Sequence, residues 1–298
     1  MKLSVIVCTR NRAQAITPCL DSIANSLAFA RPIEAEILVI DNASDDATPD
    51  VVRAWAATCE FPVSLVHEGR KGICHARNSA IRAARGELLI WTDDDCRLAE
   101  SYVRNALRYD EQDDRPVLRG GRVELGDPTD LPLTIKTDLT PRRWSSGMRS
   151  ARYECLGNCL LGCNMTMRRS LFETVGPFDA RTDDDIDLVY RCYVARIPIE
   201  YAPDLVVHHY HGRKDPARGH KLFRTYMQQM GALYAKFVLQ DPDLCRPILW
   251  DLRNAAKELV ARKNLFLPEI GFSHKQRLYY NALGALNYWL GRPVSNST

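Results

Sequence analysis

The chain has 298 residues, of which 46% are hydrophobic and 26% charged, with a formal net charge of +3 at pH 7. This length allows a large buried core in one domain or in two close-packed ones, and the composition is ordinary for a globular protein. The near balance of charge argues against a chain that binds nucleic acid over its whole surface, so no nucleic-acid partner is expected.

Neither a signal peptide nor a transmembrane helix is expected. The apolar run at the N-terminus is short and ends at the polar residues Thr9 to Arg12, and no stretch approaches the roughly 18 apolar residues of a membrane span. The ten cysteines are therefore expected to be free thiols in a reducing cytosol. Three of them recur at every fourth position, Cys155, Cys159 and Cys163, and we interpret them as small buried residues rather than as a metal site.

The first third of the chain alternates strands with helices. Short runs rich in β-branched residues predict buried strands at 3–8, 34–41, 62–68 and 86–92. Helical periodicity predicts helices at about 13–30, 50–58 and 73–84. Strands separated by helices imply right-handed crossovers and a mostly parallel sheet.

The rest of the chain is less regular at first and then helical. Strands are expected at 117–125, within 160–169, and as two short segments at 199–203 and 205–209. Residues 126–152 are expected to form a long loop. A short helix is expected to end at Gly176, and a second helix is expected at 185–195. Helical, aromatic segments follow from about Lys214 to the end.

Polar motifs follow three of the predicted strands. Thr9-Arg10-Asn11 follows the first strand, Asp41 to Asp45 follows the second, and Asp93-Asp94-Asp95 follows the fourth. The carboxyl ends of parallel strands meet at one edge of an open α/β sheet, where ligands bind. We therefore expect the three motifs to converge on one crevice.

The acidic triplet has two readings. Such a run can be a solvated turn before a helix, because aspartate caps helix N-termini well. At the ligand-binding edge of a sheet, however, semi-buried carboxylates need a counter-charge. Oxygen ligands suit Mg²⁺ or Mn²⁺, which commonly bridge carboxylates to substrate phosphates, so the triplet indicates a metal that carries a phosphorylated ligand.

The ordered set of motifs resembles a known family. "LSVIVCTRNR", "LVIDNASDD" and "KGICHARNSAIRAARGELLIWTDDD" resemble the donor half of a family 2 glycosyltransferase, and "LGCNMTMRRSLFETVGPFDARTDDDIDLVYRC" with "IEYAPDLVVHH" resembles its acceptor half. The resemblance implies a GT-A fold, which is an α/β, Rossmann-like, mostly parallel sheet flanked by helices. It implies a catalytic domain at 1–212, with a donor half at 1–98 and an acceptor half at 99–212, followed by a helical C-terminal extension at 213–298.

The resemblance also implies roles for individual residues. An inverting transferase of this kind binds a nucleotide-diphospho-sugar, with a UDP-sugar favoured, and Mn²⁺ or Mg²⁺. Thr9 and Asp41 match positions at the nucleobase, and Arg77 matches a residue that faces the diphosphate. Asp93 and Asp95 match the outer acids of the D-x-D motif, where the first meets the ribose and the last holds the metal; Asp94 is counted with the donor site.

The acceptor side carries the implied base. Gly162 and Asn164 match the small-residue approach to the acceptor pocket, and the acidic run 183–187 matches the family's acidic pair at a helix start. Asp185 is the implied general base, with Asp184 in the place of the usual glutamate and the register open by one residue. An acidic first turn that suits the helix dipole is the competing interpretation.

Histidines and a basic stretch complete the candidates. Among His208, His209 and His211, the resemblance favours His209 as the one near the metal or the diphosphate, against strand-end histidines that contact solvent. A zinc site that joins histidines to cysteines would require distant segments to meet and is not expected. The basic and aromatic residues from Arg213 to Tyr226 suit an anionic membrane surface, the diphosphate of a lipid-linked acceptor, or an ordinary amphipathic helix packed on the catalytic domain.

Other functions remain open as alternatives. A sugar-nucleotide-forming nucleotidyltransferase would share the fold and metal, but the glycines expected near the first strand are missing. A phosphatase with an aspartyl nucleophile needs a D-x-D after the first strand, which is also missing. A non-catalytic nucleotide-sugar or glycan-binding module is a further alternative. The family's usual setting predicts a cytoplasmic enzyme of polysaccharide, glycoconjugate or cell-envelope assembly, acting on a glycan or lipid-linked acceptor, with peripheral contact at the inner face of the membrane as an open question.

Overall fold

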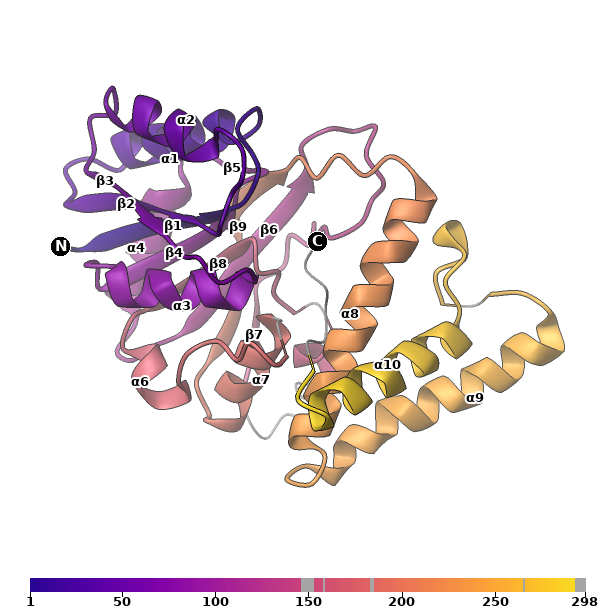
Figure 1. Cartoon of the computed structure of the whole chain (residues 1–298). Helices are drawn as coiled ribbons and strands as arrows, with labels where there is room; N and C mark the ends of the chain where they lie inside the picture. The colour runs from indigo at the N-terminus through magenta and orange to yellow at the C-terminus, as the bar shows by residue number, and fades with distance from the viewer. Residues whose placement is uncertain (146–152, 158, 183–184, 265, 293–298) are drawn as a thin grey trace. The chain divides into compact units, whose positions relative to one another are not determined.

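The computed structural model describes residues 1–145, 153–157, 159–182, 185–264 and 266–292. The chain divides into two compact units (Figure 1). Unit 1 comprises Met1–Pro128, Thr134–Phe178 and Leu188–His211; unit 2 comprises Thr129–Leu133, Asp179–Asp187 and Gly212–Thr298. The two units are described separately.

Unit 1 opens with the predicted alternation of strands and helices. The elements are β1 (Leu3–Thr9), α1 (Thr17–Phe29), β2 (Ala35–Asp41), α2 (Thr48–Ala56), β3 (Val63–His67), α3 (Ile73–Ala83) and β4 (Leu88–Asp93). Helix α1 begins four residues later than expected, because Pro18 suits the first turn of a helix and the preceding residues form a turn closed by the Arg12 carbonyl. Strands β1 to β4 pair in parallel.

The second half of unit 1 extends the same sheet with mixed strand directions. Its elements are β5 (Cys96–Leu98), α4 (Tyr102–Gln112), β6 (Leu118–Leu125), β7 (Arg142–Trp144), β8 (Asn164–Arg168), α6 (Leu171–Val175), α7 (Asp185–Val194), which begins in unit 2, and β9 (Ile199–His209). The strand order is β3-β2-β1-β4-β8-β6-β9-β5, and β7 pairs with β9. The sheet is thus the mixed, mostly parallel α/β sheet of the prediction.

Strand β9 corrects the expectation of two short strands. Pro203 breaks the pattern in the sequence, because proline has no N–H to donate to a ladder. The structure instead absorbs the interruption in a register shift. Gly121 pairs with Ala202, the next residue Arg122 pairs with Val206, and β9 continues to His209. The predicted loop 126–152 likewise contains β7, which pairs with β9.

The core lies on both faces of the sheet. Alternate residues of β1 point to opposite sides, so Leu3, Val5 and Val7 pack in one cluster with α1 and α4 residues, while Ile6 packs in the other with α3, α6 and α7 residues. In Figure 1, α1 and α2 lie on one face of the parallel strands and α3 on the other. This two-sided burial explains why the strands read as continuous apolar runs.

Unit 2 is built mainly from three helices, α8 (Pro216–Phe237), α9 (Cys245–Ala261) and α10 (His274–Trp289), with short 3₁₀ turns η1 (Pro242–Leu244) and η2 (Pro268–Ile270). Helices α8 and α10 approach at backbone contact through Gly231 and Gly284. A Cβ atom on Gly284 would lie 1.9 Å from the Gln228 carbonyl oxygen. Among the described residues, no helix is both long enough and apolar enough to cross a membrane.

The basic, aromatic stretch that begins α8 packs within unit 2. Phe223 contacts the rings of Tyr226 and Phe272, and the guanidinium of Arg224 lies over the ring of Tyr280. Phe223 and Tyr226 border a small buried cluster that contains Met227 and Phe272. These aromatic side chains thus have partners inside unit 2.

Candidate functional site

The acidic triplet lies where β4 ends and β5 begins. β4 ends at Asp93, β5 starts at Cys96, and the backbone N–H of Tyr210 donates to the Asp95 carbonyl oxygen at 2.8 Å. This pairing of β5 with the end of β9 brings His209 to the triplet, with its Nε2 atom 3.3 Å from Asp95 Oδ1. One carboxylate oxygen each from Asp93 and Asp95 and one ring nitrogen of His209 all lie within 4.8 Å of one another.

This donor set fits a hard or borderline divalent cation. Two carboxylates and an imidazole are ligands that Mn²⁺ accepts readily, and the ion would neutralise adjacent acids in a semi-buried place. The acids are largely covered, since the side chains of Asp94 and Asp95 are 11% and 12% exposed. The solvated-turn interpretation of the triplet is therefore wrong.

Arg12 places a positive charge beside the acidic triplet, and the sequence analysis did not identify this residue. Its Nε lies 3.1 Å from Asp94 Oδ1, and its terminal nitrogen lies 3.4 Å from Asp95 Oδ2. Burial raises the pKa of Asp94 to about 6, with repulsion from the neighbouring aspartates adding to the rise and Arg12 opposing it. A basic residue just past β1, facing acids just past β4, is the signal that could have identified Arg12, since the two strands are neighbours in the sheet.

His209 is held as a cation by the same acids. Burial alone would lower its pKa, but the hydrogen bond with Asp95 and the nearby negative groups raise the pKa to about 9. His208 instead lies 3.6 Å from Glu124, and its side chain is 40% exposed. The ring of His211 packs edge-on against that of His209 at 5.1 Å between centroids. Of the three histidines, His209 is thus the one beside Asp95.

The predicted nucleobase residues meet at the ends of β1 and β2. Thr9 and Asp41 are paired across the parallel ladder, and the Asn42 N–H donates to the Thr9 carbonyl oxygen at 2.8 Å. Asp41 is buried, and one of its oxygens lies 2.9 Å from Nδ1 of His67, at the end of β3. The neighbouring ends of β1, β2 and β3 therefore form one polar surface, made by Thr9, Asp41 and His67, which we call the polar ledge. The sequence analysis did not identify His67 as part of it.

Arg77 lies on α3, on the other side of the sheet from α1. Its side chain is buried, and its guanidinium lies 5.2 Å from the centre of the Phe178 ring. The neighbouring Asn78 side chain hydrogen-bonds the backbone of Phe178 in both directions, at 2.8 and 2.9 Å. Arg77 is therefore a fixed group, and its predicted place at the diphosphate stays a prediction.

Asn164 has a structural role in unit 1. It is fully buried; its side-chain oxygen accepts from the Tyr102 hydroxyl at 2.7 Å, and its amide donates to the carbonyls of Arg122 and Leu205. The side chain therefore ties β6, β8, β9 and α4 together, so contact with an acceptor would fall to its surroundings. Gly162, two residues earlier, is half-buried. The acceptor roles of both residues stay predictions.

The implied catalytic base begins α7. Asp185 is the first residue of that helix, in unit 2, and Asp184 lies outside the described residues. Asp187, one of the other acids of the run, is fully buried and ion-pairs with Lys236 of α8 at 2.6 Å. Lys236 also lies 2.8 Å from Asp179. Asp187 is thus committed to an internal ion pair, and the assignment of the base to Asp185 stays a prediction.

The cysteines are free thiols, and most are buried, including Cys155, Cys159 and Cys163, as expected. The distant segments that such a zinc site would need do meet, because Cys96 and Cys163 lie beside His209, with one ligand atom of each residue within 4.8 Å of the others. The sequence could not show this, because the contact depends on how β5, β8 and β9 are ordered in the sheet.

Comparison with known proteins identifies similar chains. The model of the family described as "Glycosyl transferase family 2" matches residues 4–176. The glycosyltransferase AglE of Haloferax volcanii is 24% identical over 206 residues, which cover 68% of this chain and 65% of AglE. Other curated relatives are matched over 29% and 30% of their own lengths, so this chain spans less than two thirds of these relatives.

Solved structures share the fold. The mannosyltransferase PcManGT from Pyrobaculum calidifontis, solved with GDP-Man and Mn²⁺, superposes with a TM-score of 0.59 at 23% identity, covering 95% of this chain and 73% of PcManGT. Residues 1–349 of S. aureus TarS, solved with UDP, superpose with a TM-score of 0.57 at 16% identity, covering 98% of this chain and 92% of that one. These likenesses confirm the predicted GT-A fold.

Proposed function

Because this chain belongs to glycosyl transferase family 2, we propose that it transfers a sugar from a nucleotide-diphospho-sugar to an acceptor hydroxyl. The observation that carries the proposal is the meeting of Asp93, Asp95 and His209 at the carboxyl edge of the sheet. The polar ledge of Thr9, Asp41 and His67 is next to this group in the strand order, so a nucleotide can lie along one edge.

We assign the donor roles along that edge. Thr9 and Asp41 bind the nucleobase, Asp93 and Asp94 bind the donor, and Arg77 binds its diphosphate through charge-assisted hydrogen bonds. Asp95 and His209 would hold the divalent cation, with Asp93 close by. When bound, this ion would offset negative charge on the diphosphate leaving group. When an ion binds, Arg12 would give up its contacts with Asp94 and Asp95, and the ion would take its place beside these carboxylates.

Asp185 acts as general base in a single inverting displacement. Its carboxylate removes the proton of the acceptor hydroxyl as that oxygen attacks the anomeric carbon, and the bond to the diphosphate breaks on the opposite side. The nucleoside diphosphate leaves with the electron pair. Asp184, Gly162 and Asn164 belong to the proposed acceptor side.

A UDP-sugar is the favoured donor, and a GDP-sugar is the main competitor. Solved structures with this fold include one with UDP and one with GDP-Man, so the fold accepts both bases. The acceptor is proposed to be a glycan or a lipid-linked glycan in polysaccharide or envelope assembly, on the cytoplasmic side.

We also propose that unit 2 contacts an anionic membrane, through α9. Large apolar side chains are exposed on it, from 51% for Leu252 to 87% for Val260. Its exposed charges are basic, at Arg246, Arg253 and Lys257, whereas its acids Asp251 and Glu258 are buried. Exposed tryptophan and leucine beside basic residues are typical of a helix that lies at a lipid surface.

A thermal-shift screen of nucleotide-sugars tests the enzyme proposal. A donor that binds the folded chain at 100 times its Kd stabilises it by about 2.7 kcal/mol, which raises the melting temperature. We expect the rise to require Mn²⁺ and to vanish in Asp95→Asn, while Asp50→Asn, whose side chain is 80% exposed, behaves as wild type. Manganese-dependent donor hydrolysis or transfer separates an enzyme from a binding module. If no nucleotide-sugar shifts the melting temperature with Mn²⁺ present, the proposal is wrong.

A further inference from the structure

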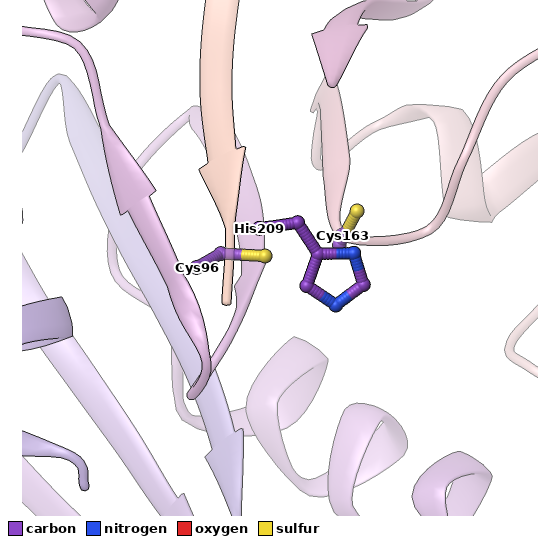
Figure 2. A group of neighbouring side chains, drawn as sticks. All are labelled: Cys96, Cys163 and His209. Carbon is purple, nitrogen blue, oxygen red and sulfur yellow. The ribbon is translucent and has the colours of Figure 1, made fainter. Parts of the chain in front are cut away.

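Two thiols and an imidazole lie together at the edge of the sheet where the sugar donor is proposed to bind. Cys96 comes from β5, Cys163 directly precedes β8, and His209 ends β9 (Figure 2). One ligand atom of each residue lies within 4.8 Å of the other two, and the residues are 0%, 5% and 5% exposed, respectively. Cys96 and His209 are directly opposite in the β5–β9 ladder, so the sheet itself fixes their spacing.

This set of donor atoms differs in kind from the carboxylate site. Sulfur and imidazole nitrogen are soft to borderline ligands that select Zn²⁺ and similar ions over Mg²⁺. We propose that Cys96, Cys163 and His209 form a binding site for a soft divalent ion of the Zn²⁺ class. Of these three ligands, only His209 also belongs to the group formed by Asp93, Asp95 and His209.

The geometry is close to what such an ion needs. Zinc binds sulfur at about 2.3 Å and imidazole nitrogen at about 2.0–2.1 Å, so atoms sharing one tetrahedral ion lie roughly 3.3–3.8 Å apart. Because the three atoms lie within 4.8 Å of one another, each pair would move closer by no more than about 1.5 Å. Asp95 is at hand as a fourth ligand, because its Oδ1 atom lies 3.9 Å from Cys96 Sγ and 3.3 Å from His209 Nε2.

Charge balance favours the same ion. On binding, each thiol and the protonated His209 ring release a proton to water, so the imidazole binds as a neutral ligand and the two thiolates neutralise the divalent ion. The three-ligand cluster is therefore neutral, which suits a buried place where an unbalanced charge would be costly. With Asp95 as fourth ligand the cluster carries one negative charge, and Arg12 lies 3.4 Å from the Oδ2 atom of Asp95 to offset it. The surrounding residues agree, because Cys96 and Cys163 belong to the apolar cluster that contains Val123 and Val207.

The shared histidine links the two groups. An ion bound by the thiols takes a nitrogen of His209, so it competes with an ion held by Asp93 and Asp95. This consequence rests on the proposed donor site, whereas the thiol site itself does not. We expect micromolar Zn²⁺ to weaken the Mn²⁺-dependent binding of donor in the wild type and to do so less in Cys163→Ala.

Cobalt absorption tests the thiol site directly, without reference to activity. The reduced, metal-free full chain is titrated with Co²⁺, which reports thiolate ligation by a charge-transfer band in the near ultraviolet and tetrahedral geometry by visible bands. We expect both, with one ion per chain, and we expect added Zn²⁺ to bleach them. Cys96→Ala and Cys163→Ala should each lose the charge-transfer band, whereas Cys159→Ala, another buried thiol, and Cys245→Ala, an exposed one, should keep it.

Two further results decide the matter. Absence of the thiolate band in the wild-type chain would overturn the proposal, whatever the variants do, and so would a band that survives in both Cys96→Ala and Cys163→Ala. Asp93→Asn separates this inference from the proposed function, because it removes a ligand of the carboxylate group only. It should lose donor-dependent stabilisation with Mn²⁺ and retain the cobalt–thiolate band.

Discussion

Asp185 stands at the first position of α7, two residues before the buried Asp187. We expect Asp185→Asn to keep the melting-temperature rise caused by donor and Mn²⁺, because the amide has the same shape and the donor residues lie elsewhere in the chain. Transfer should fall by about 10²–10⁴-fold, which is the usual contribution of a general base. Parallel thermal-shift and turnover measurements check both parts.

A control for this substitution is Asp243→Asn, at an exposed acid of unit 2 whose side chain is 42% accessible. It should leave both quantities unchanged. Near-normal turnover in Asp185→Asn would move the base to another acid of the run 183–187.

At the scale of single residues, the sequence predicted groups that carry their own signal. Aspartates that directly follow a buried strand can be recognised from the sequence alone, and so can a histidine at the end of such a strand. Arg12, His67 and Lys236 were missed because each acts through a partner on a different strand or helix. Arginines and lysines that follow strands or fill helices are common, so the acid that each one meets can be identified only when the order of the strands and helices is known.

At the scale of elements, Lys236 fixes the acidic segment of unit 2 to α8. Its side chain is 16% exposed and contacts Asp187, which is 1% exposed, and Asp179. We expect Lys236→Met to destabilise the protein by about 3–5 kcal/mol, since it leaves a buried carboxylate without its partner. Urea unfolding measures this change, and Lys221→Met, at an exposed position on the same helix, should have an effect near zero.

The same ion pair gives the expected pH dependence. Burial alone would raise the pKa of Asp179, but the hydrogen bonds from Lys236 and Arg181 lower it to about 2. A carboxyl group with a depressed folded-state pKa stabilises the fold above its unfolded pKa of about 4 and loses that contribution as the pH falls toward about 2. Asp179→Asn should therefore flatten the fall in stability over this range. If Asp179→Asn loses stability with falling pH as steeply as the wild type, the lowered pKa of Asp179 does not contribute to acid unfolding.

The crossing of α8 and α10 depends on two glycines. A Cβ atom at position 284 would lie 1.9 Å from a backbone oxygen of α8, which cannot move aside as a flexible side chain can. We expect Gly284→Ala to cost at least about 1–3 kcal/mol by forcing the helices apart. Gly69→Ala is the control, because its new methyl would have its nearest neighbour at 3.7 Å. Equal melting temperatures for the two variants would show that the helices part without strain.

Elements with a strong local pattern were predicted well from the sequence, and elements defined by pairing were not. β1, β2 and β4 are nearly continuous apolar runs because both faces of the sheet are covered, so their pattern identifies them. β5 and β7 have three residues each and exist only because β9 pairs with them. Their few residues carry no periodicity, and the position of β9 could not be known in advance.

At the scale of the whole molecule, charge is balanced overall but unevenly distributed. The net charge of +3 argued against a chain that binds nucleic acid over its whole surface. The structure distinguishes two basic stretches of unit 2, the one that the sequence analysis identified from Arg213 to Tyr226 and a second one on α9. Aromatic residues near the start of α8 pack inside the unit, whereas α9 exposes Trp250, Leu259 and Val260 beside basic residues. Of the two, α9 is therefore the better candidate for lipid contact.

Vesicle sedimentation distinguishes the two stretches. At low salt, the wild-type chain should sediment with vesicles that contain anionic lipid and not with neutral ones. Each basic residue near such a surface contributes about 1 kcal/mol, so reversing Arg253 and Lys257 to glutamate should reduce the bound fraction at least about tenfold. Reversing Lys214 and Lys221 at the start of α8 is the matched control and should change binding little. If the control pair lowers binding as much as the α9 pair, contact runs through α8; if the wild type sediments with neither lipid and instead dimerises with increasing concentration, the apolar face of α9 belongs to a second copy of the chain.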